Sequence, residues 1–322
     1  MAVRPGDAAV LQLVELPSPL PGPGEVLIRV VATALNRADL LQRQGRYPPP
    51  PGASEVLGLE CAGEIVQVGE GVPSTRLGER VMALLAGGGY AEEAVAPAGC
   101  ALPIPPAFSW EEAAALPEAA LTVFLTVFQL ARLRPGETLL VHGGGSGIGT
   151  MAIAMGREAG AEVVVTAGTP EKCNRCRELG AREAICYREE DFAERLRDLT
   201  AGRGIDVILD PVGAPYLARN LAVLAQGGRL VLIATMGGGE ATIDLRTVLR
   251  KHLAIIGSTL RSRPTAEKEA LAAAFLASFG EALEAGRLRP VIDSVYPLAE
   301  VAEAHRRMAT SAHLGKIVLR VS

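Results

Sequence analysis

Thr138-Leu-Leu-Val-His-Gly-Gly-Gly-Ser-Gly-Ile-Gly149 is a short apolar run that leads directly into a glycine-rich loop. Glycines let the backbone turn tightly and approach a ligand closely, and the amide groups that open a following helix point toward an anion. The spacing of Gly145 and Gly147 approximates the GxGxxG pattern, but Thr150 stands where the third glycine would be. The stretch predicts a strand, a phosphate-binding turn and a helix; an ordinary glycine-rich turn is the alternative.

The residues after this loop favour a nucleotide-binding unit. Residues 151–160 are rich in small and apolar side chains and predict a helix, and residues 162–166 form an apolar run of strand length. Further apolar runs alternate with helical segments, at residues 184–186, 205–210, 229–234 and 253–258. This alternation is typical of a parallel sheet with helices on both faces. We therefore predict an α/β chain with a doubly wound Rossmann sheet, which binds its ligand at the carboxyl ends of the strands.

The end of the second strand indicates the cofactor. NAD enzymes of this type place an acidic residue there, but residues 166–169 read Thr-Ala-Gly-Thr and are neutral. Thr169 is the expected N-cap and Pro170 the first helical residue, so Lys172 falls in a first turn, where a cation opposes the helix dipole. A solvated surface lysine is one explanation, and a bound 2′-phosphate is the other. We predict NADPH as the cofactor.

The overall composition excludes several classes of partner. The chain has 322 residues, 49% of them hydrophobic, which is enough for two domains. Its 32 basic and 36 acidic residues give a formal net charge of −4, and no basic run is present, so we expect neither nucleic acid nor a membrane as a partner. The first residues lack the apolar core of a signal peptide, and residues 121–131 are too few to span a bilayer about 30 Å thick. We expect a soluble, cytoplasmic protein.

The cysteines and histidines do not have the spacing of a metal site. The five cysteines are an odd number, so we expect reduced thiols. Cys173 and Cys176 form a CxxC, but they fall inside the helix that begins at Pro170, and no second pair exists to complete a zinc site. The four histidines show no ligand spacing either. No metal is predicted.

The nucleotide-binding unit begins near Leu116, and what surrounds it is different. Before it, short apolar stretches at residues 26–35, 62–68 and 80–84 are separated by Pro and Gly turns, which predicts a β-rich region. After residue 259 we predict a helix at 267–285, a strand at 291–296, a helix at 299–309 and a strand at 316–321. We predict that residues 1–118 and 259–322 form one domain and residues 119–258 the other.

This order of segments resembles the zinc-independent quinone oxidoreductase branch of the medium-chain dehydrogenase/reductase superfamily, in particular its tumour-suppressor-inducible group. The resembling stretches, beside the glycine loop, are residues 34–39, 43–53, 58–60, 117–119, 165–168, 236–239, 260–263 and 315–319. The resemblance implies a β-rich GroES-like catalytic domain, an active site in a cleft between two domains, and a homodimer. One departure is the start, because the family has a longer first strand than residues 1–5 allow; we expect an incomplete first hairpin.

The same resemblance implies reduction without a metal. Zinc alcohol dehydrogenases of the superfamily carry a cysteine where this chain has Asn36, and a histidine-glutamate pair where it has Leu59 and Glu60. Tyr47 is the first candidate for a hydrogen-bond donor to the acceptor, since it precedes four prolines that force an extended backbone. Ser146 is the second candidate, although its hydroxyl can equally cap the helix after the loop.

The resemblance also implies cofactor contacts, each with packing within the fold or surface exposure as its alternative. Asn36 and Thr122 would line the nicotinamide end, and Tyr187 would lie beside the 2′-phosphate. The full expected cofactor set is Asn36, Thr122, Gly144, Gly145, Ser146, Gly147, Ile148, Gly168, Thr169, Lys172, Tyr187, Met236, Gly237, Leu260, Arg261 and Lys316.

These features together predict an NADPH-dependent enzyme that reduces quinones or other conjugated carbonyls by direct, metal-free hydride or electron transfer. Two alternatives stay open. One is an enoyl or enone reductase of the same superfamily. The other is a non-catalytic NADPH-binding protein with a crystallin-like or sensing role.

Overall fold

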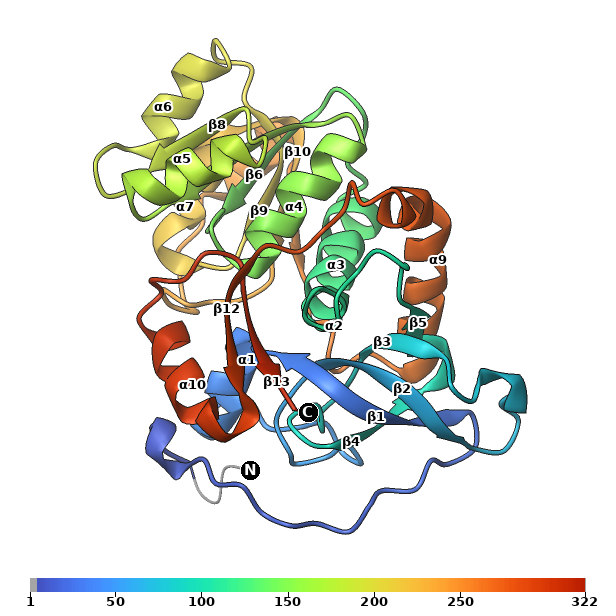
Figure 1. Cartoon of the computed structure of the whole chain (residues 1–322). Helices are drawn as coiled ribbons and strands as arrows, with labels where there is room; N and C mark the ends of the chain where they lie inside the picture. Colours follow the sequence, from blue (N-terminus) through green and yellow to red (C-terminus); the bar gives the residue numbers. More distant parts are fainter. Residues whose placement is uncertain (1–4, 322) are drawn as a thin grey trace. The chain divides into compact units, whose positions relative to one another are not determined.

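The computed structural model describes residues 5–321, and the chain divides into two compact units (Figure 1). Met1–Leu121 together with Leu260–Ser322 make up the first, which we call the β-rich unit. Thr122–Thr259 make up the second, the Rossmann unit. The predicted domain limits, at residues 118 and 259, lie close to these boundaries.

The Rossmann unit is built on a sheet with the strand order β11-β10-β9-β6-β7-β8, in which every neighbouring pair is parallel. Its strands are β6 (Thr138–His142), β7 (Glu162–Ala167), β8 (Glu183–Cys186), β9 (Ile205–Asp210), β10 (Leu224–Leu232) and β11 (Ala254–Gly257). Its helices are α4 (Gly147–Glu158), α5 (Pro170–Glu178), α6 (Phe192–Leu199), α7 (Ala214–Val223) and α8 (Leu245–Lys251), and a π-helical segment, η4 (Phe124–Leu130), precedes β6. The predicted doubly wound sheet is confirmed.

Helices cover both faces of this sheet because side chains alternate along each strand. On one face, α6 and α7 pack on a core that includes Leu140, Val164 and Ile208. On the opposite face, α4 approaches so closely that a Cβ atom on Gly156 would lie 2.5 Å from Val163 Cγ2. The close packing of α4 fixes the helix that begins at the glycine loop.

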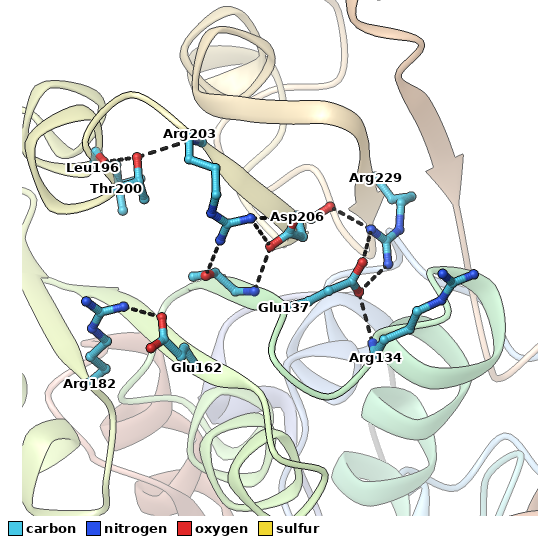
Figure 2. A network of polar contacts seen from close by, with 11 residues as sticks. Arg134, Glu137, Glu162, Arg182, Leu196, Thr200, Arg203, Asp206 and Arg229 are labelled. Carbon is cyan, nitrogen blue, oxygen red and sulfur yellow. Dashed lines mark hydrogen bonds and ion pairs between the residues drawn. The ribbon is translucent and has the colours of Figure 1, made fainter.

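Ion pairs gather at the amino ends of these strands (Figure 2). Glu137 accepts from Arg229 Nη2 at 2.7 Å, and Asp206 pairs with Arg203 at 3.0 Å and accepts from the Thr138 amide at 2.8 Å. Partly exposed pairs of this kind each contribute about 0–1 kcal/mol. These ion pairs lie at the amino ends of the strands, whereas a ligand is expected at the carboxyl ends. We therefore regard the ion pairs as structural.

The β-rich unit contains a sheet with the order β12-β13-β1-β2-β3-β5, and β4 pairs with β1. Its strands are β1 (Glu25–Ala34), β2 (Glu60–Val68), β3 (Arg80–Leu84), β4 (Glu93–Pro97), β5 (Ala101–Pro103), β12 (Ile292–Pro297) and β13 (Lys316–Arg320). Its helices are α1 (Arg37–Arg43), α2 (Trp110–Ala114), α9 (Thr265–Glu284) and α10 (Val301–Ala309), with short 3-10 turns η1 (Ala8–Val10), η2 (Ser74–Arg76), η3 (Ala98–Cys100) and η5 (Leu298–Glu300). Helix α3 (Pro117–Val123) crosses into the Rossmann unit. Because β13 pairs with β1, the C-terminal segment belongs to the first unit.

The expected incomplete first hairpin falls partly on residues 1–4, which lie outside the described residues. Residues 12–22 form no strand and run extended below the sheet of the β-rich unit, in blue in Figure 1. Leu13, Leu16 and Leu20 of this segment are exposed. Along residues 5–321, no helix combines the length and the apolar character needed to cross a membrane.

Candidate active site

The glycine loop connects β6 to α4 at the carboxyl end of the sheet. Ser146 is the N-cap of α4, and its Oγ accepts from the Gly149 amide at 3.0 Å. Gly147 and Ile148 open the helix, where first-turn amides have no partner inside the helix and can bind a phosphate. A Cβ atom on Gly144 would lie 2.5 Å from Val165 Cβ, so only glycine fits there. The loop can cradle a pyrophosphate.

The third glycine of the pattern is Gly149 rather than residue 150. A Cβ atom on Gly149 would lie 2.4 Å from the Gly143 carbonyl oxygen, so α4 can approach the strand only with glycine here. Thr150 instead turns its hydroxyl to the Gly147 carbonyl, at 3.2 Å. The glycine that lets the helix approach the strand is therefore still present, but it stands one residue earlier than in the GxGxxG pattern.

A second corner of the Rossmann unit follows β7. Thr169 caps α5 and accepts from the Lys172 amide at 3.3 Å, which confirms the predicted helix start. The Lys172 side chain packs against the glycine loop, since its Cδ lies 3.3 Å from the Cβ position of Gly145. The hydroxyl of Tyr187 lies 2.8 Å from the Cβ position of Gly168, at the neutral end of β7. A lysine and a phenol thus flank the region where a ribose 2′-phosphate would be recognised.

A buried polar chain supports this edge of the sheet. His142 Nδ1 lies 3.0 Å from Thr166 Oγ1, His142 Nε2 lies 2.8 Å from Asn220 Oδ1, and Asn220 Nδ2 donates to Asp210 Oδ2 at 2.9 Å. Burial lowers the pKa of His142 to about 4, against a weaker opposing effect of its bond to Asn220. The imidazole is therefore neutral, with Nε2 as donor and Nδ1 as acceptor. Sequence reasoning missed this chain, although His142 and Asp210 each end an apolar strand.

The loop after β10 lies against the loop after β9. Met236 N donates to the Pro211 carbonyl at 3.1 Å, and Gly237 N donates to the Val212 carbonyl at 2.8 Å. Val212 N in turn donates to Asp210 Oδ1 at 2.6 Å. The buried chain therefore also holds the backbone that precedes the predicted nicotinamide contacts Met236 and Gly237.

In the β-rich unit, a charged cluster is centred on Glu60. Its carboxylate accepts from Lys316 Nζ at 2.6 Å, from Asn36 Nδ2 at 2.8 Å and from the Glu118 amide at 2.9 Å. Lys316 also donates to Asn36 Oδ1 at 2.7 Å and to the Leu35 carbonyl at 2.8 Å, and it is only 4% exposed. Asn36 and Lys316 thus have partners within this unit, and their cofactor contacts stay predictions.

Tyr47 and Arg261 lie together in the same unit. The Arg261 guanidinium carbon lies 5.4 Å from the centre of the Tyr47 ring. Arg261 Nε donates to the Ala86 carbonyl and Nη2 donates to Gln42 Oε1, both at 2.7 Å. Burial raises the pKa of Tyr47, Glu118 raises it further, and Arg261 opposes the rise. The phenol keeps its proton and can donate a hydrogen bond.

Two carboxyl groups near this cluster were not predicted as site residues. Burial, followed by the charge of Glu60, raises the pKa of Glu118 to about 8. Burial raises the pKa of Asp39 to about 6, although Asp39 accepts from the amides of Asn36 and Gly58. Both residues lie in stretches that resemble the family, but their raised pKa values could not be predicted, because the main cause is burial in the folded unit.

Of the remaining predicted residues, Thr122 and Leu260 are buried. The five cysteines are free and buried, Cys173 and Cys176 within α5 as predicted. Residues 5–321 contain no group of three or more His, Cys, Asp or Glu side chains placed to hold a metal ion.

Comparison with known proteins assigns both units. Residues 22–106 match the family model of the alcohol dehydrogenase GroES-like domain, and residues 147–277 match that of the zinc-binding dehydrogenases. A quinone oxidoreductase of Lama guanicoe is 34% identical over 317 residues, which cover 98% of this chain and 94% of the relative. The phthioceranic/hydroxyphthioceranic acid synthase of Mycobacterium tuberculosis is 35% identical over 322 residues, but the chain spans only 15% of its length.

Solved structures resemble the whole chain as well. An NAD-dependent alcohol dehydrogenase has a TM-score of 0.87 at 33% identity and covers 100% of this chain, with 98% of its own length matched. The quinone oxidoreductase of Escherichia coli complexed with NADPH has a TM-score of 0.86 at 30% identity, with 99% of this chain and 98% of that one covered. The chain therefore belongs to the medium-chain dehydrogenase/reductase superfamily, in which its full-length relatives include quinone oxidoreductases.

Proposed function

We propose that this protein reduces quinones with NADPH. The observation that carries the proposal is the contact of Tyr47 with Arg261, whose guanidinium carbon lies over the phenol ring, 5.4 Å from its centre. A planar ring with carbonyl oxygens suits such a pair, since an aromatic ring stacks on it and N–H and O–H donors bind its oxygens. The full-length similarity to quinone oxidoreductases supports the same substrate class.

The Rossmann unit would hold the cofactor. The cradle at Gly144 and Gly149, which no larger residue could occupy, and the first-turn amides of α4 fit a dinucleotide pyrophosphate. Lys172 and Tyr187 beside the neutral end of β7 fit a 2′-phosphate. When bound, NADPH supplies the hydride. The remaining predicted contacts, including Thr122, Met236, Leu260 and Lys316, stay part of the proposal.

Tyr47 would orient the acceptor and donate a hydrogen bond to its oxygen, with Ser146 as the second candidate for a catalytic hydroxyl. Ser146 Oγ already accepts from Gly149, yet its own O–H proton can still be donated. A quinone needs no Lewis acid, because negative charge delocalises over its conjugated ring. The side chains at Asn36 and Leu59 agree with a metal-free reaction, since a leucine cannot ligate zinc.

An enoyl reductase is the second candidate, and it rests on the similarity to a segment of the mycobacterial acid synthases. A reductase within such a synthase would act on enoyl thioesters and would need a proton donor for the α-carbon. A panel of quinones and a panel of enoyl thioesters, each followed by NADPH absorbance, separate the two. We expect turnover on quinones. Turnover confined to thioesters would replace the proposal with the second candidate, and tight NADPH binding without any turnover would favour a binding protein.

A further inference from the structure

The guanidinium of Arg261 has an unmet hydrogen-bonding group. Two of its nitrogens are bonded to Ala86 and Gln42, but Nη1 finds no partner among residues 5–321. The side chain is buried, with 4% of the residue exposed. Buried donors without acceptors are rare and destabilising, and a charged one is more so. An oxygen of a bound ligand would supply the missing acceptor.

The surroundings of Arg261 indicate what kind of ligand fits. The ring of Tyr47 lies against the guanidinium, and burial lowers the pKa of Arg261, while the charge of Asp39 opposes this effect. An aromatic face beside a cationic donor suits a flat acceptor whose oxygen becomes negative during reduction.

Among the described residues, the carboxyl group of Glu118 forms no ion pair with the cations of this group. Lys316 is fully engaged by Glu60, Asn36 and the Leu35 carbonyl. The backbone amide of Glu118 donates to Glu60, whereas its carboxyl oxygens form no hydrogen bond with the described residues.

A count of charges agrees with a protonated Glu118. The groups that act on Glu118 are Glu60 on β2, Asp39 on α1, Lys316 on β13 and Arg261. Lys316 forms its ion pair with Glu60, and three carboxyl groups face two cations, so a proton on Glu118 would remove the excess negative charge. Burial and the charge of Glu60 raise its pKa to about 8, so at neutral pH this carboxyl can donate its proton.

We propose that Glu118 is the acid that protonates the reduced acceptor and that Arg261 Nη1 binds the oxygen receiving the proton. The inference rests on the proposed quinone reduction. The hydride supplied by bound NADPH would form a bond to one quinone oxygen with its two electrons and leave negative charge on the other oxygen. The O–H bond of Glu118 then breaks, an O–H bond forms on the acceptor to give the hydroquinone, and solvent returns a proton to the carboxylate. Tyr47, whose pKa is raised, keeps its proton and only donates a hydrogen bond.

The first test needs no cofactor. In the infrared spectrum of the protein alone, a protonated carboxyl band should titrate near pH 8 in the wild type and be missing from Glu118→Gln. Glu64→Gln, an exposed carboxyl of the same strand as Glu60, is the matched control and should keep the band. Persistence of the band in Glu118→Gln would overturn the assignment of the acid.

Stability provides a second readout that does not depend on activity. A raised pKa means that the stability contributed by Glu118 is complete below its ordinary pKa of 4.5 and is lost as the pH rises through about 8. Glutamine does not titrate, so Glu118→Gln should melt at or above the wild-type temperature at pH 9. A lower melting temperature at pH 9 than the wild type would contradict a protonated carboxyl.

The catalytic step is tested by kinetics and by binding. Wild-type turnover of duroquinone should fall above about pH 8. Glu118→Gln should turn over about 10- to 1000-fold more slowly, with a rate that does not change with pH and with unchanged NADPH affinity.

Arg261→Lys keeps the positive charge but loses the planar guanidinium, and it should weaken duroquinone binding to the protein alone about 10- to 100-fold. If the wild type reduces quinones and both variants behave like it, this inference alone fails. If the wild type reduces no quinone, both the proposed function and this inference fail. The infrared titration still shows in that case whether Glu118 is protonated.

Discussion

At the scale of single residues, we expect Lys172 to decide the cofactor preference. Its side chain packs beside the glycine loop, and residues 166–169 at the end of β7 include no acidic side chain to repel a phosphate. A charge-assisted hydrogen bond to the 2′-phosphate should favour NADPH over NADH by about 1–3 kcal/mol. Dissociation constants of both cofactors, measured at one salt concentration, should show this preference in the wild type and its loss in Lys172→Ala. Arg175→Ala, an exposed residue of the same helix, is the control. A preference that survives Lys172→Ala would refute the assignment.

Tyr47 is the residue whose substitution separates binding from catalysis. Tyr47→Phe keeps the ring but removes the hydroxyl, so quinone turnover should fall about 10- to 1000-fold, the range for loss of an oxyanion or proton-transfer group. NADPH affinity should stay the same. If Tyr47 only stacks on the acceptor, Tyr47→Ala should raise the Michaelis constant and Tyr47→Phe should change almost nothing. Tyr296→Phe in β12 serves as the control. Wild-type kinetics in both variants would leave Ser146 as the hydroxyl to test.

Residues whose partners are near in sequence were predictable, and residues whose partners are distant were not. Ser146 and Thr169 act within their own helix starts, so a short pattern identifies them. Glu118 owes its raised pKa to burial and to Glu60, and Glu60 itself meets Lys316 only because β2 and β13 both pair with β1. Strand pairing of this kind leaves no trace in the spacing of a single sequence.

At the scale of elements, the hydrophobic pattern predicted the strands of the Rossmann unit because strands buried on both faces read as continuous apolar runs. The predicted start of β10 was wrong by five residues. The strand begins at Leu224, which pairs with Ile205, and not at Arg229. A register shift lies between Leu224 and Arg229, and Gly227 within it has a φ of +71°. The apolar sequence pattern is therefore interrupted there, although β10 continues through these residues. β4 and β5 were not predicted individually, since strands of five and three residues are too short for a clear alternation.

At the scale of the whole molecule, the apolar surface of the Rossmann unit indicates a partner. β11 is the edge strand of its sheet, and Ile255 in it is 39% exposed. Leu245 and Leu249, on the helix that precedes β11, are 63% and 73% exposed. An unpaired edge with apolar side chains can pair with another strand, and a second copy of the chain could extend the sheet across a two-fold axis.

We therefore expect a homodimer in solution that forms through β11. Light scattering at micromolar concentration should give twice the mass of the chain, which is 33.6 kDa. Ile255→Lys adds a charge to the edge, and charged side chains on edge strands oppose pairing, so this variant should shift the mass toward the monomer. Leu77→Lys, at a leucine of the β-rich unit that is 49% exposed, controls for the loss of an apolar surface residue and should remain dimeric. A wild-type monomer at this concentration would exclude the dimer, and a dimer that persists in Ile255→Lys would place the interface away from this edge.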